Sequence, residues 1–262
     1  MTSTTGAATS RETDAQVAAR LATEAGHVLL QVRAELQGRG APPWQVMDTG
    51  DMAAQRHLAQ ALHETRPDDA ILSEEAAEDP RRKSATRVWI IDPLDGTNEF
   101  GEPGRSDWAV HVALWERGDL VAAAVSLPAH DITFATDPAP VLPPSIRSRP
   151  RLITSRNRAP YAAMLVSDAL GCDAVRLGSA GAKAMAVVLG EADIYVHDGG
   201  MYQWDSAAPA AVAMAAGLHA SRIDGSPLVY NARDPWLPDF MICRSELAQP
   251  VLEAIWGGRQ RR

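Results

Sequence analysis

The sequence predicts an α+β fold, in which helices and strands both form large parts of the chain. Apolar residues recur at helical spacing over 14–36 and predict a long amphipathic helix. Short β-prone runs separated by turn residues follow in the middle of the chain. Beyond a proline-rich stretch at 137–150, strands and helices alternate. At 262 residues the chain is long enough for one large domain or two closely packed halves.

The composition excludes several classes of protein. Hydrophobic residues make up 46% and charged residues 22% of the chain, which is ordinary for a soluble globular protein. A net charge of -8 argues against a nucleic acid polymer as partner. Cys172 and Cys243 provide neither a disulfide framework nor a zinc motif, so we expect a cytoplasmic protein. No apolar run approaches the roughly 20 residues that span a bilayer, so we expect no membrane partner.

The chain begins with a leader and two predicted helices. Residues 1–13 have no basic start and no apolar core, so we expect a disordered leader and not a signal peptide. The first helix is predicted from Asp14, its N-cap, to Leu36, and the glycines and prolines at 38–43 end it. The second is predicted over 52–63. Asp51 stands just before it, which suits an N-cap as well as a ligand.

A short apolar strand predicted at Ala70–Ser73 is followed by two acids, Glu74 and Glu75. Glutamates at the end of a strand are usually solvated loop residues, and the sequence leaves this interpretation open beside a ligand role. A basic stretch from Pro80 to Thr86 is predicted to be an exposed connection to the next strand.

That next strand leads into the motif around which the chain is organised. The β-prone run that starts at Val88 ends in Asp92, Pro93 forces a turn, and Asp95 follows before Gly96. Proline fixes φ and glycine lets the backbone approach a ligand, so the two carboxylates and the intervening carbonyl can converge on one point. The motif therefore indicates a hard-cation site beside a phosphate cradle. A surface turn with two solvated aspartates is the alternative.

The β-rich runs at 108–115, 120–127 and 132–136 predict an antiparallel meander. The following segment, 137–150, holds five prolines and few apolar residues, so we place the boundary between two halves there. The predicted parts are a leader at 1–13, an N-terminal half at 14–145 and a C-terminal half at 146–262. The C-terminal half is predicted to contain strands at 152–154, 174–177, 192–197 and 239–243, and helices at 160–170 and 245–256.

Two stretches of the C-terminal half combine small or polar residues with a helix start. Residues 178–183, Gly-Ser-Ala-Gly-Ala-Lys, could bind a phosphate through backbone N–H groups and Lys183, but small residues there also permit close helix packing. Asp205 follows Trp204 and could be an N-cap. Pro209 is expected in the first turn of that helix.

The remaining chemistry-bearing residues give weaker signals. The seven histidines show no metal-ligand spacing, and we expect core or surface roles for His111 and His197, which lie in predicted strands. No serine sits in a Gly-Xaa-Ser-Xaa-Gly turn, so covalent hydrolase chemistry has no support.

Residues 92–97, Asp-Pro-Leu-Asp-Gly-Thr, resemble the signature of the inositol monophosphatase superfamily, which are magnesium-dependent, lithium-sensitive phosphatases. Residues 204–208, Trp-Asp-Ser-Ala-Ala, resemble its second signature, and 71–75 resemble its metal-site glutamate pair. The likeness runs from about residue 15 to near the C-terminus. It implies the layered αβαβα sandwich of the sugar phosphatase fold, with the metal site between the halves. Many relatives are homodimers, so a dimer is expected.

The resemblance also implies roles for individual residues. Two or three Mg²⁺ ions, for which Mn²⁺ could substitute, would be held by Asp51, Glu74, Asp92, the Leu94 carbonyl, Asp95 and Asp205. Oxygen-only ligands favour these metals over zinc. Glu74, Thr97 and Asp51 would be catalytic, with Asp51 orienting Thr97. The implied substrate contacts are Glu74, Leu94, Asp95, Gly96, Thr97, Ser179, Lys183 and Asp205.

The implied substrate depends on smaller differences within the superfamily. Glu99-Phe100 and the stretch at 224–231 look like its nucleotide-directed, CysQ-like branch, the 3'(2'),5'-bisphosphate nucleotidases. The resemblance therefore implies hydrolysis of 3'-phosphoadenosine 5'-phosphate, a by-product of sulfate assimilation, to AMP, with the phosphosulfate as a second substrate. The alternatives are an inositol-1-phosphate or fructose-1,6-bisphosphate phosphatase, or a catalytically silent metal-binding or scaffold member.

Overall fold

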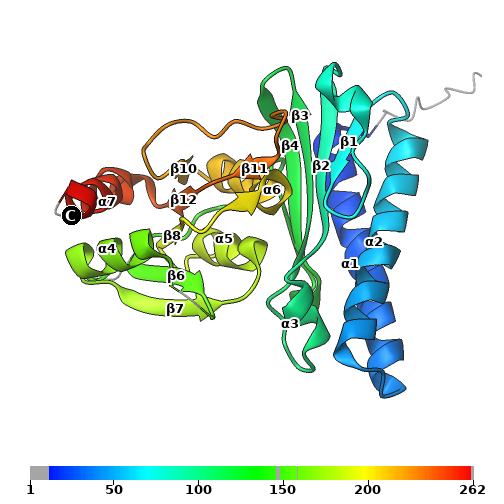
Figure 1. Cartoon of the computed structure of the whole chain (residues 1–262), viewed down its shortest axis with the longest axis horizontal. Helices are drawn as coiled ribbons and strands as arrows, with labels where there is room; N and C mark the ends of the chain where they lie inside the picture. Colours follow the sequence, from blue (N-terminus) through cyan, green and yellow to red (C-terminus); the bar gives the residue numbers. More distant parts are fainter. Residues whose placement is uncertain (1–11, 146–147, 158, 261–262) are drawn as a thin grey trace, which may run out of the picture.

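Two long helices, α1 (Asp14–Gly38) and α2 (Pro43–Thr65), form the outermost layer at the N-terminal side of the molecule (Figure 1). This computed structural model describes residues 12–145, 148–157 and 159–260, so the predicted leader lies outside the described residues except for Glu12 and Thr13. The N-cap of α1 is Thr13 and not Asp14, because the Thr13 hydroxyl accepts a hydrogen bond from the Gln16 N–H at 3.2 Å.

The second helix begins well before the predicted start. Pro43 is its first residue, where proline is tolerated because the first N–H groups of a helix have no intrahelical acceptor. Asp51 therefore lies inside α2, and its interpretation as an N-cap is wrong. The helix begins before Asp51 and continues past it.

The first sheet has the strand order β1-β2-β3-β4-β5, with β1 parallel to β2 and every later pair antiparallel. The predicted meander of β3, β4 and β5 is confirmed. The strands are β1 (Ala70–Ser73), β2 (Arg87–Asp95), β3 (Ala109–Glu116), β4 (Asp119–Leu127) and β5 (Ile132–Ala135).

The motif strand β2 does not end at Asp92 as predicted. It continues through Pro93 to Asp95, and its pairing with β3 shifts register between the two aspartates. A proline has no N–H for the ladder, and a bulge lets the strand pass this position. Because the strand stays buried over 88–95, both carboxylates lie inside the protein, not on a solvated turn.

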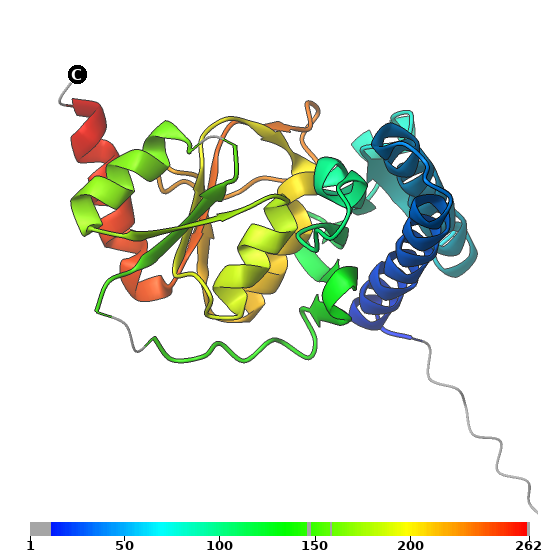
Figure 2. The same cartoon turned by 90° about the horizontal axis from the view of Figure 1, so that it is seen from below.

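The second sheet has the order β10-β12-β8-β6-β7 and occupies the C-terminal side. Figure 2 shows the connection after β5 running along one side of the molecule toward this sheet. The strands are β6 (Arg151–Ser155), β7 (Asp173–Leu177), β8 (Ile194–His197), β10 (His219–Ser221) and β12 (Phe240–Cys243), and a separate pair joins β9 (Met201–Tyr202) to β11 (Trp236–Leu237).

Helices α5 (Ala180–Val188) and α6 (Gln203–Ala215) fill the space between the sheets, and α4 (Tyr161–Leu170) and α7 (Ala248–Gln260) cover the far side of the second sheet (Figure 1). Three apolar clusters follow this layering: one surrounds α5 and α6 between the two sheets, one lies between the first sheet and α1 and α2, and one lies under α4 and α7. Pro209 lies inside α6, beyond the first turn where it was expected. Short 3₁₀ turns occur at Pro128–His130 and Ser245–Leu247.

The basic stretch before β2 is not simply an exposed connection. Residues Pro80–Lys83 form a 3₁₀ turn, η1, and the Arg82 side chain is only 1% exposed. Its partners lie on a distant loop, which the sequence pattern gave no means to foresee.

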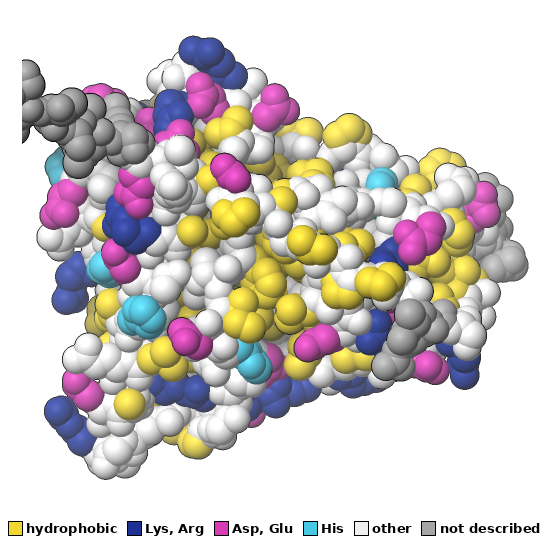
Figure 3. All heavy atoms as spheres, turned by 180° about the vertical axis from the view of Figure 1, so that it is seen from behind, with side chains coloured by type: hydrophobic (Ala, Val, Ile, Leu, Met, Phe, Trp, Pro, Cys, Tyr) yellow, Lys and Arg dark blue, Asp and Glu magenta, His cyan; other side chains and the backbone are white. Residues whose placement is uncertain are grey.

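The surface shows mixed charge. On the face seen in Figure 3, hydrophobic side chains gather in the middle, and basic and acidic side chains are interspersed around them. Among the described residues, no helix has the length and apolar character needed to cross a membrane.

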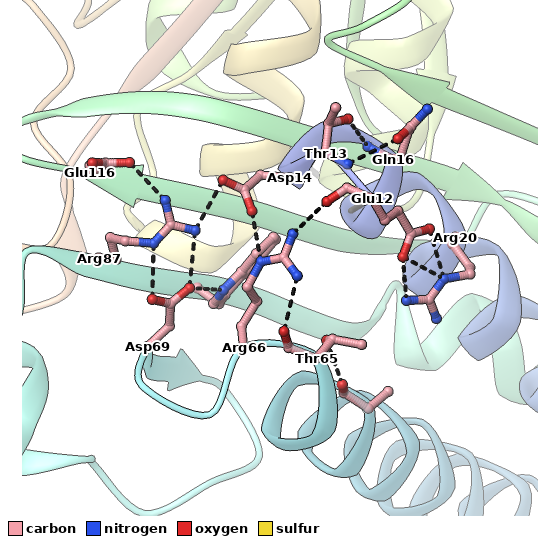
Figure 4. A network of polar contacts seen from close by, with 12 residues as sticks. Glu12, Thr13, Asp14, Gln16, Arg20, Thr65, Arg66, Asp69, Arg87 and Glu116 are labelled. Atoms are coloured by element: carbon pink, nitrogen blue, oxygen red, sulfur yellow. Dashed lines mark hydrogen bonds and ion pairs between the residues drawn. The ribbon is translucent and has the colours of Figure 1, made fainter. Parts of the chain in front are cut away.

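Two arginines fasten the start of α1 to the end of α2 and to β2 (Figure 4). Arg66 donates to Asp14 at 2.9 Å, and Arg87 donates to Asp14, Asp69 and Glu116 at 2.8–3.1 Å. A cavity of about 470 Å³ borders this network. We assign it no ligand, because its arginines are already paired with acids.

Replacing Arg87 tests this network. We expect Arg87→Met to lower the free energy of unfolding by about 2 kcal/mol, because three carboxylates lose a charged donor. Burial acts to raise the pKa of Asp14, but hydrogen bonds from Arg66 and Arg87 bring it below its ordinary value. That stabilisation exists above the ordinary carboxyl pKa and is lost as the pH falls, so the difference should shrink below about pH 4.

Urea denaturation of the variant and wild type across pH measures this effect. Arg39→Met is the control, since Arg39 is 75% exposed and lies 4.0 Å from its single acidic partner, Glu35. We expect a change within about 0.5 kcal/mol for the control. Equal losses in the two variants would contradict the role given to the network.

Candidate active site

Three buried or half-buried acids meet between the two sheets. Oxygens of Asp92, Asp95 and Asp205 all lie within 4.8 Å of one another. The bulge of β2 places the first two, and the first turn of α6 places the third. Asp205 is held by the N–H of Tyr202, which donates to its carboxylate at 2.7 Å. Residues more than a hundred positions apart in the chain thus form one cluster.

The first turn of α5 holds Asp95 in place. The Asp95 carboxylate accepts hydrogen bonds from the Ala180 N–H at 3.0 Å, the Gly181 N–H at 2.6 Å and the Ser179 hydroxyl. A helix N-terminus favours negative charge, because its N–H groups are unpaired and its dipole is positive there. Ser179 therefore binds a site carboxylate and also caps α5, through the Ala182 N–H at 3.0 Å.

His111 is a site residue that the sequence analysis missed. It is fully buried on β3, as expected of a core residue, but its Nε2 lies 3.3 Å from the Asp95 carboxylate and its Nδ1 lies 3.8 Å from Asp92. Nδ1 also contacts the Trp204 carbonyl at 3.1 Å. The available signal was the strand register, since His111 pairs directly with Asp92 across the sheet. That register becomes visible only once the two strands are aligned.

The three acids have very different proton affinities. Burial, followed by the charges of Asp95 and Glu74, raises the pKa of Asp92 well above its ordinary value. Burial and the charge of Asp95 raise the pKa of Asp205 to about 6. Burial acts in the same direction on Asp95, but hydrogen bonds from His111 and Ser179 lower its pKa to about 2. Without a counter-charge, therefore, the cluster favours taking up protons.

Glu74 and Asp51 lie at the edge of this cluster and not among its three converging acids. Glu74 follows β1 and remains accessible to solvent. Packing around its carboxyl, together with the charges of Asp205 and Glu75, raises its pKa to about 7. Asp51 on α2 has a pKa of about 7, raised by burial and by the charges of Glu75 and Glu74. Both groups are thus close enough to other acids to be perturbed by them.

The end of the motif packs against the central helices. Gly96 has φ of 88°, and a Cβ there would lie 3.0 Å from Ser179 Cβ and 3.2 Å from the Asp107 carbonyl oxygen. The Thr97 hydroxyl donates to the Leu94 carbonyl at 3.1 Å. Among the described residues it has no hydrogen bond to Asp51, so the predicted Thr97–Asp51 pair stays a prediction.

Lys183 points inward. Its Nζ donates to the Ser179 carbonyl at 2.8 Å and to the Gly178 carbonyl, and the residue is 6% exposed. Burial lowers its pKa from the ordinary lysine value. Lys183 therefore orders the loop at 178–183 in this structure, and its predicted contact with a phosphate stays a prediction.

A cavity of about 430 Å³ opens beside the acids. Asp95, Asp205, Gly96, Ser179 and Lys183 line one part of it. Tyr202 and Trp236 line another part and are 43% and 46% exposed. The Tyr202 ring stacks on Trp204 at a centroid distance of 4.6 Å and meets Trp236 edge-on at 5.3 Å. We call Tyr202 and Trp236 the aromatic wall.

The donor set fits a hard divalent cation. Asp92 Oδ2 is buried and has no hydrogen-bond partner among the described residues, although a carboxylate oxygen in the interior normally has one. The converging ligand atoms are all carboxylate oxygens, which Mg²⁺, Mn²⁺ and Ca²⁺ prefer and which zinc seldom uses alone.

The sequence profile of the inositol monophosphatase family matches residues 10–257, and the chain belongs to this family. The family predicted from the motifs is thereby confirmed. The 3'-phosphoadenosine 5'-phosphate phosphatase of Mycobacterium bovis is 49% identical over 240 residues, which cover 88% of this chain and 89% of that protein. The enzyme of the same name from Mycobacterium leprae is 48% identical over 255 residues, covering 93% of each chain.

A solved structure confirms the predicted sandwich. The crystal structure of CysQ from Bacteroides thetaiotaomicron, described as a bacterial member of the inositol monophosphatase family, superposes with a TM-score of 0.74. The match covers 89% of this chain and 97% of that one at 23% sequence identity.

Removing one carboxylate from the cluster tests whether it is a cation site. At pH 7 we expect Asp92→Asn to raise the melting temperature of the metal-free protein, because burial of an acid with a raised pKa destabilises the fold above the ordinary carboxyl pKa and asparagine does not ionise. The same variant should lose the increase in melting temperature that Mg²⁺ gives the wild type. Thermal unfolding in EDTA and in Mg²⁺ measures both effects.

The control for this measurement is Asp48→Asn, an exposed acid on α2 outside the three-acid cluster. It should keep the wild-type response to Mg²⁺. An Asp92→Asn variant that is stabilised by Mg²⁺ as strongly as the wild type would overturn the assignment.

Proposed function

We propose that this chain is a Mg²⁺-dependent phosphatase that hydrolyses 3'-phosphoadenosine 5'-phosphate to AMP and phosphate. The observation that carries the proposal is one cavity that joins two carboxylates of the acid cluster to an exposed aromatic wall. The acids suit a cation, which in turn would bind a phosphate, and the wall suits a nucleobase. The names of the mycobacterial relatives agree with this substrate.

The proposed metal ligands are the ones that the motifs indicated. Asp92, Asp95 and Asp205 form the converging set, and Glu74, Asp51 and the Leu94 carbonyl would complete it for two or three ions. Divalent cations bound there would activate water and stabilise charge on the phosphoryl and leaving oxygens.

The chain's own residues would prepare this reaction. The α5 N-terminus and His111 keep Asp95 ionised and fixed in direction. Glu74, which follows β1 beside the acid cluster, would hold a cation and orient an attacking water. Thr97 would position that water with Asp51, and the backbone amides of Gly96 and Thr97 would contact the phosphate.

The aromatic wall favours a nucleotide over an inositol phosphate. A base can stack on an exposed indole or phenol ring, and such stacking contributes about 1–3 kcal/mol per base. An inositol ring has no π face and gains little from it. We therefore rank the inositol-1-phosphate and fructose-1,6-bisphosphate activities below the nucleotide activity.

The setting of the enzyme forms part of the proposal. Both cysteines are free, Cys172 half-buried and Cys243 buried, which agrees with a reducing cytoplasm. We also propose a homodimer, substitution of Mg²⁺ by Mn²⁺, and inhibition by Li⁺ through competition for a cation position.

Phosphate release from a panel of esters tests the activity. We expect the kcat/KM for 3'-phosphoadenosine 5'-phosphate to exceed those for inositol 1-phosphate and fructose 1,6-bisphosphate. Release should require Mg²⁺, fall with Li⁺ and be lost in Asp92→Asn. A higher kcat/KM for inositol 1-phosphate would overturn the nucleotide assignment. Lack of Mg²⁺-dependent release from every ester would favour a silent metal-binding member.

Replacing one residue of the aromatic wall tests base recognition. We expect Trp236→Leu to raise the KM for the nucleotide about tenfold, because stacking is lost while the acid cluster is retained. The kcat should change by less than about threefold. Trp256→Leu is the matched control, since Trp256 is 53% exposed on α7 and does not line the cavity. Equal effects of the two substitutions would contradict base stacking at this wall.

A further inference from the structure

One buried arginine joins the acidic loop after β1 to the loop that leads into the aromatic wall. The Arg82 Nη1 donates to the Ala232 carbonyl at 2.9 Å and to Asn231 Oδ1 at 3.2 Å. Its Nη2 donates to the Arg233 carbonyl at 3.0 Å and to Glu78 Oε1 at 2.6 Å. A single guanidinium therefore binds three oxygens of one loop and one carboxylate of the other.

The contact is reciprocal and shapes the second loop. Asn231 Nδ2 donates back to the Arg82 carbonyl at 3.2 Å. Asn231 has φ of 55°, in the left-handed region that asparagine adopts more readily than most residues. The turn at 231–233 thus folds around the Arg82 side chain, which is 1% exposed.

The turn at 231–233 is connected to the cavity through the short segment that follows it. Residues 234–235 lead directly into β11, where Trp236 pairs with Tyr202 of β9. The Gln203 N–H donates to the Pro235 carbonyl at 2.8 Å, which ties the same segment to the first residue of α6. Asp205 lies two residues further along that helix. The segment after the turn therefore contacts both the aromatic wall and the start of α6, which carries Asp205.

Arg82 also binds the acidic loop after β1. Glu78, its carboxylate partner, follows Glu74 and Glu75 in the connection between β1 and η1. Lys83 also contacts Glu78, at 3.1 Å. The side chain of Arg82 does not line the cavity, so it acts through the two loops that it holds.

We propose that Arg82 is a positioning residue, which fixes the aromatic wall relative to the acids by holding the turn at 231–233 against the loop at 74–78. Only a planar guanidinium can donate to four oxygens in this arrangement, because the lysine ammonium has three donors around one point. The consequence named for nucleotide binding rests on the proposed function, whereas the clamp between the two loops does not.

The first test compares neighbouring arginines of η1. We expect Arg82→Lys to raise the KM for 3'-phosphoadenosine 5'-phosphate about tenfold and to change kcat by less than about threefold, because the wall shifts while Asp92 and Asp95 stay in place on β2. Arg81→Lys is the matched control, since Arg81 lies in the same turn, is 63% exposed and pairs with Asp79. It should leave both constants within about twofold of the wild type.

A second measurement needs no substrate. Amide hydrogen exchange of the free enzyme should be about tenfold faster over 231–237 in Arg82→Lys than in the wild type, with α1 unchanged. Asn231→Gly serves if Arg82→Lys does not fold, because glycine accepts the positive φ while both side-chain contacts are removed. It should shift the exchange and the KM in the same direction by a smaller factor.

The outcomes separate the two proposals. A wild type that hydrolyses no nucleotide would refute the proposed function, and the exchange measurement would still test the clamp. Unchanged exchange over 231–237 in a folded variant would overturn the clamp. A lowered melting temperature with an unchanged KM would overturn the positioning role of Arg82, since Arg82 would then contribute to stability alone.

Discussion

The structure depends on keeping three carboxylates together in a place with little water. Two unit charges about 5 Å apart repel by roughly 3 kcal/mol at an effective dielectric constant of 20, and a whole domain is stable by only about 5–15 kcal/mol. The fold offsets part of this with the N-terminus of α5 and with His111, both directed at Asp95. Asp92 receives much less support, since one of its oxygens has no partner among the described residues. This asymmetry leaves a position for a cation.

The layered architecture explains why these groups meet. The bulge in β2 turns two acids toward the central layer, and that layer supplies the helix N-termini that face them. The cavity opens at the same junction, so a ligand there contacts parts from both sheets. The acid cluster and the aromatic wall are therefore set by one packing arrangement, and Arg82 adds a direct link between the loop after β1 and the loop before β11.

The sequence predicted those structural features that depend on residues close together in the chain. The motif at 92–97, the meander and most helices follow from local pattern, and the family and fold followed from the motifs. It could not reveal what depends on contacts across the chain. His111 reaches the acids only through strand register, Arg82 meets oxygens far along the chain, and Lys183 turns inward because two carbonyls lie within its reach. The start of α2 could not be foreseen because Gly50 and Asp51 are typical of a helix start, whereas the helix continues through both residues.

The early start of α2 places Asp51 on a rigid helix that is made long before Asp205 leaves the ribosome. During synthesis, Asp92 and Asp95 also emerge well before α5 and α6, so both side chains are at first surrounded by water. They lose that water only when the central helices dock and supply their N–H groups. The support for Asp95 therefore exists only where the first sheet and α5 are in contact, so the site and the packing between the two sheets are formed by the same residues.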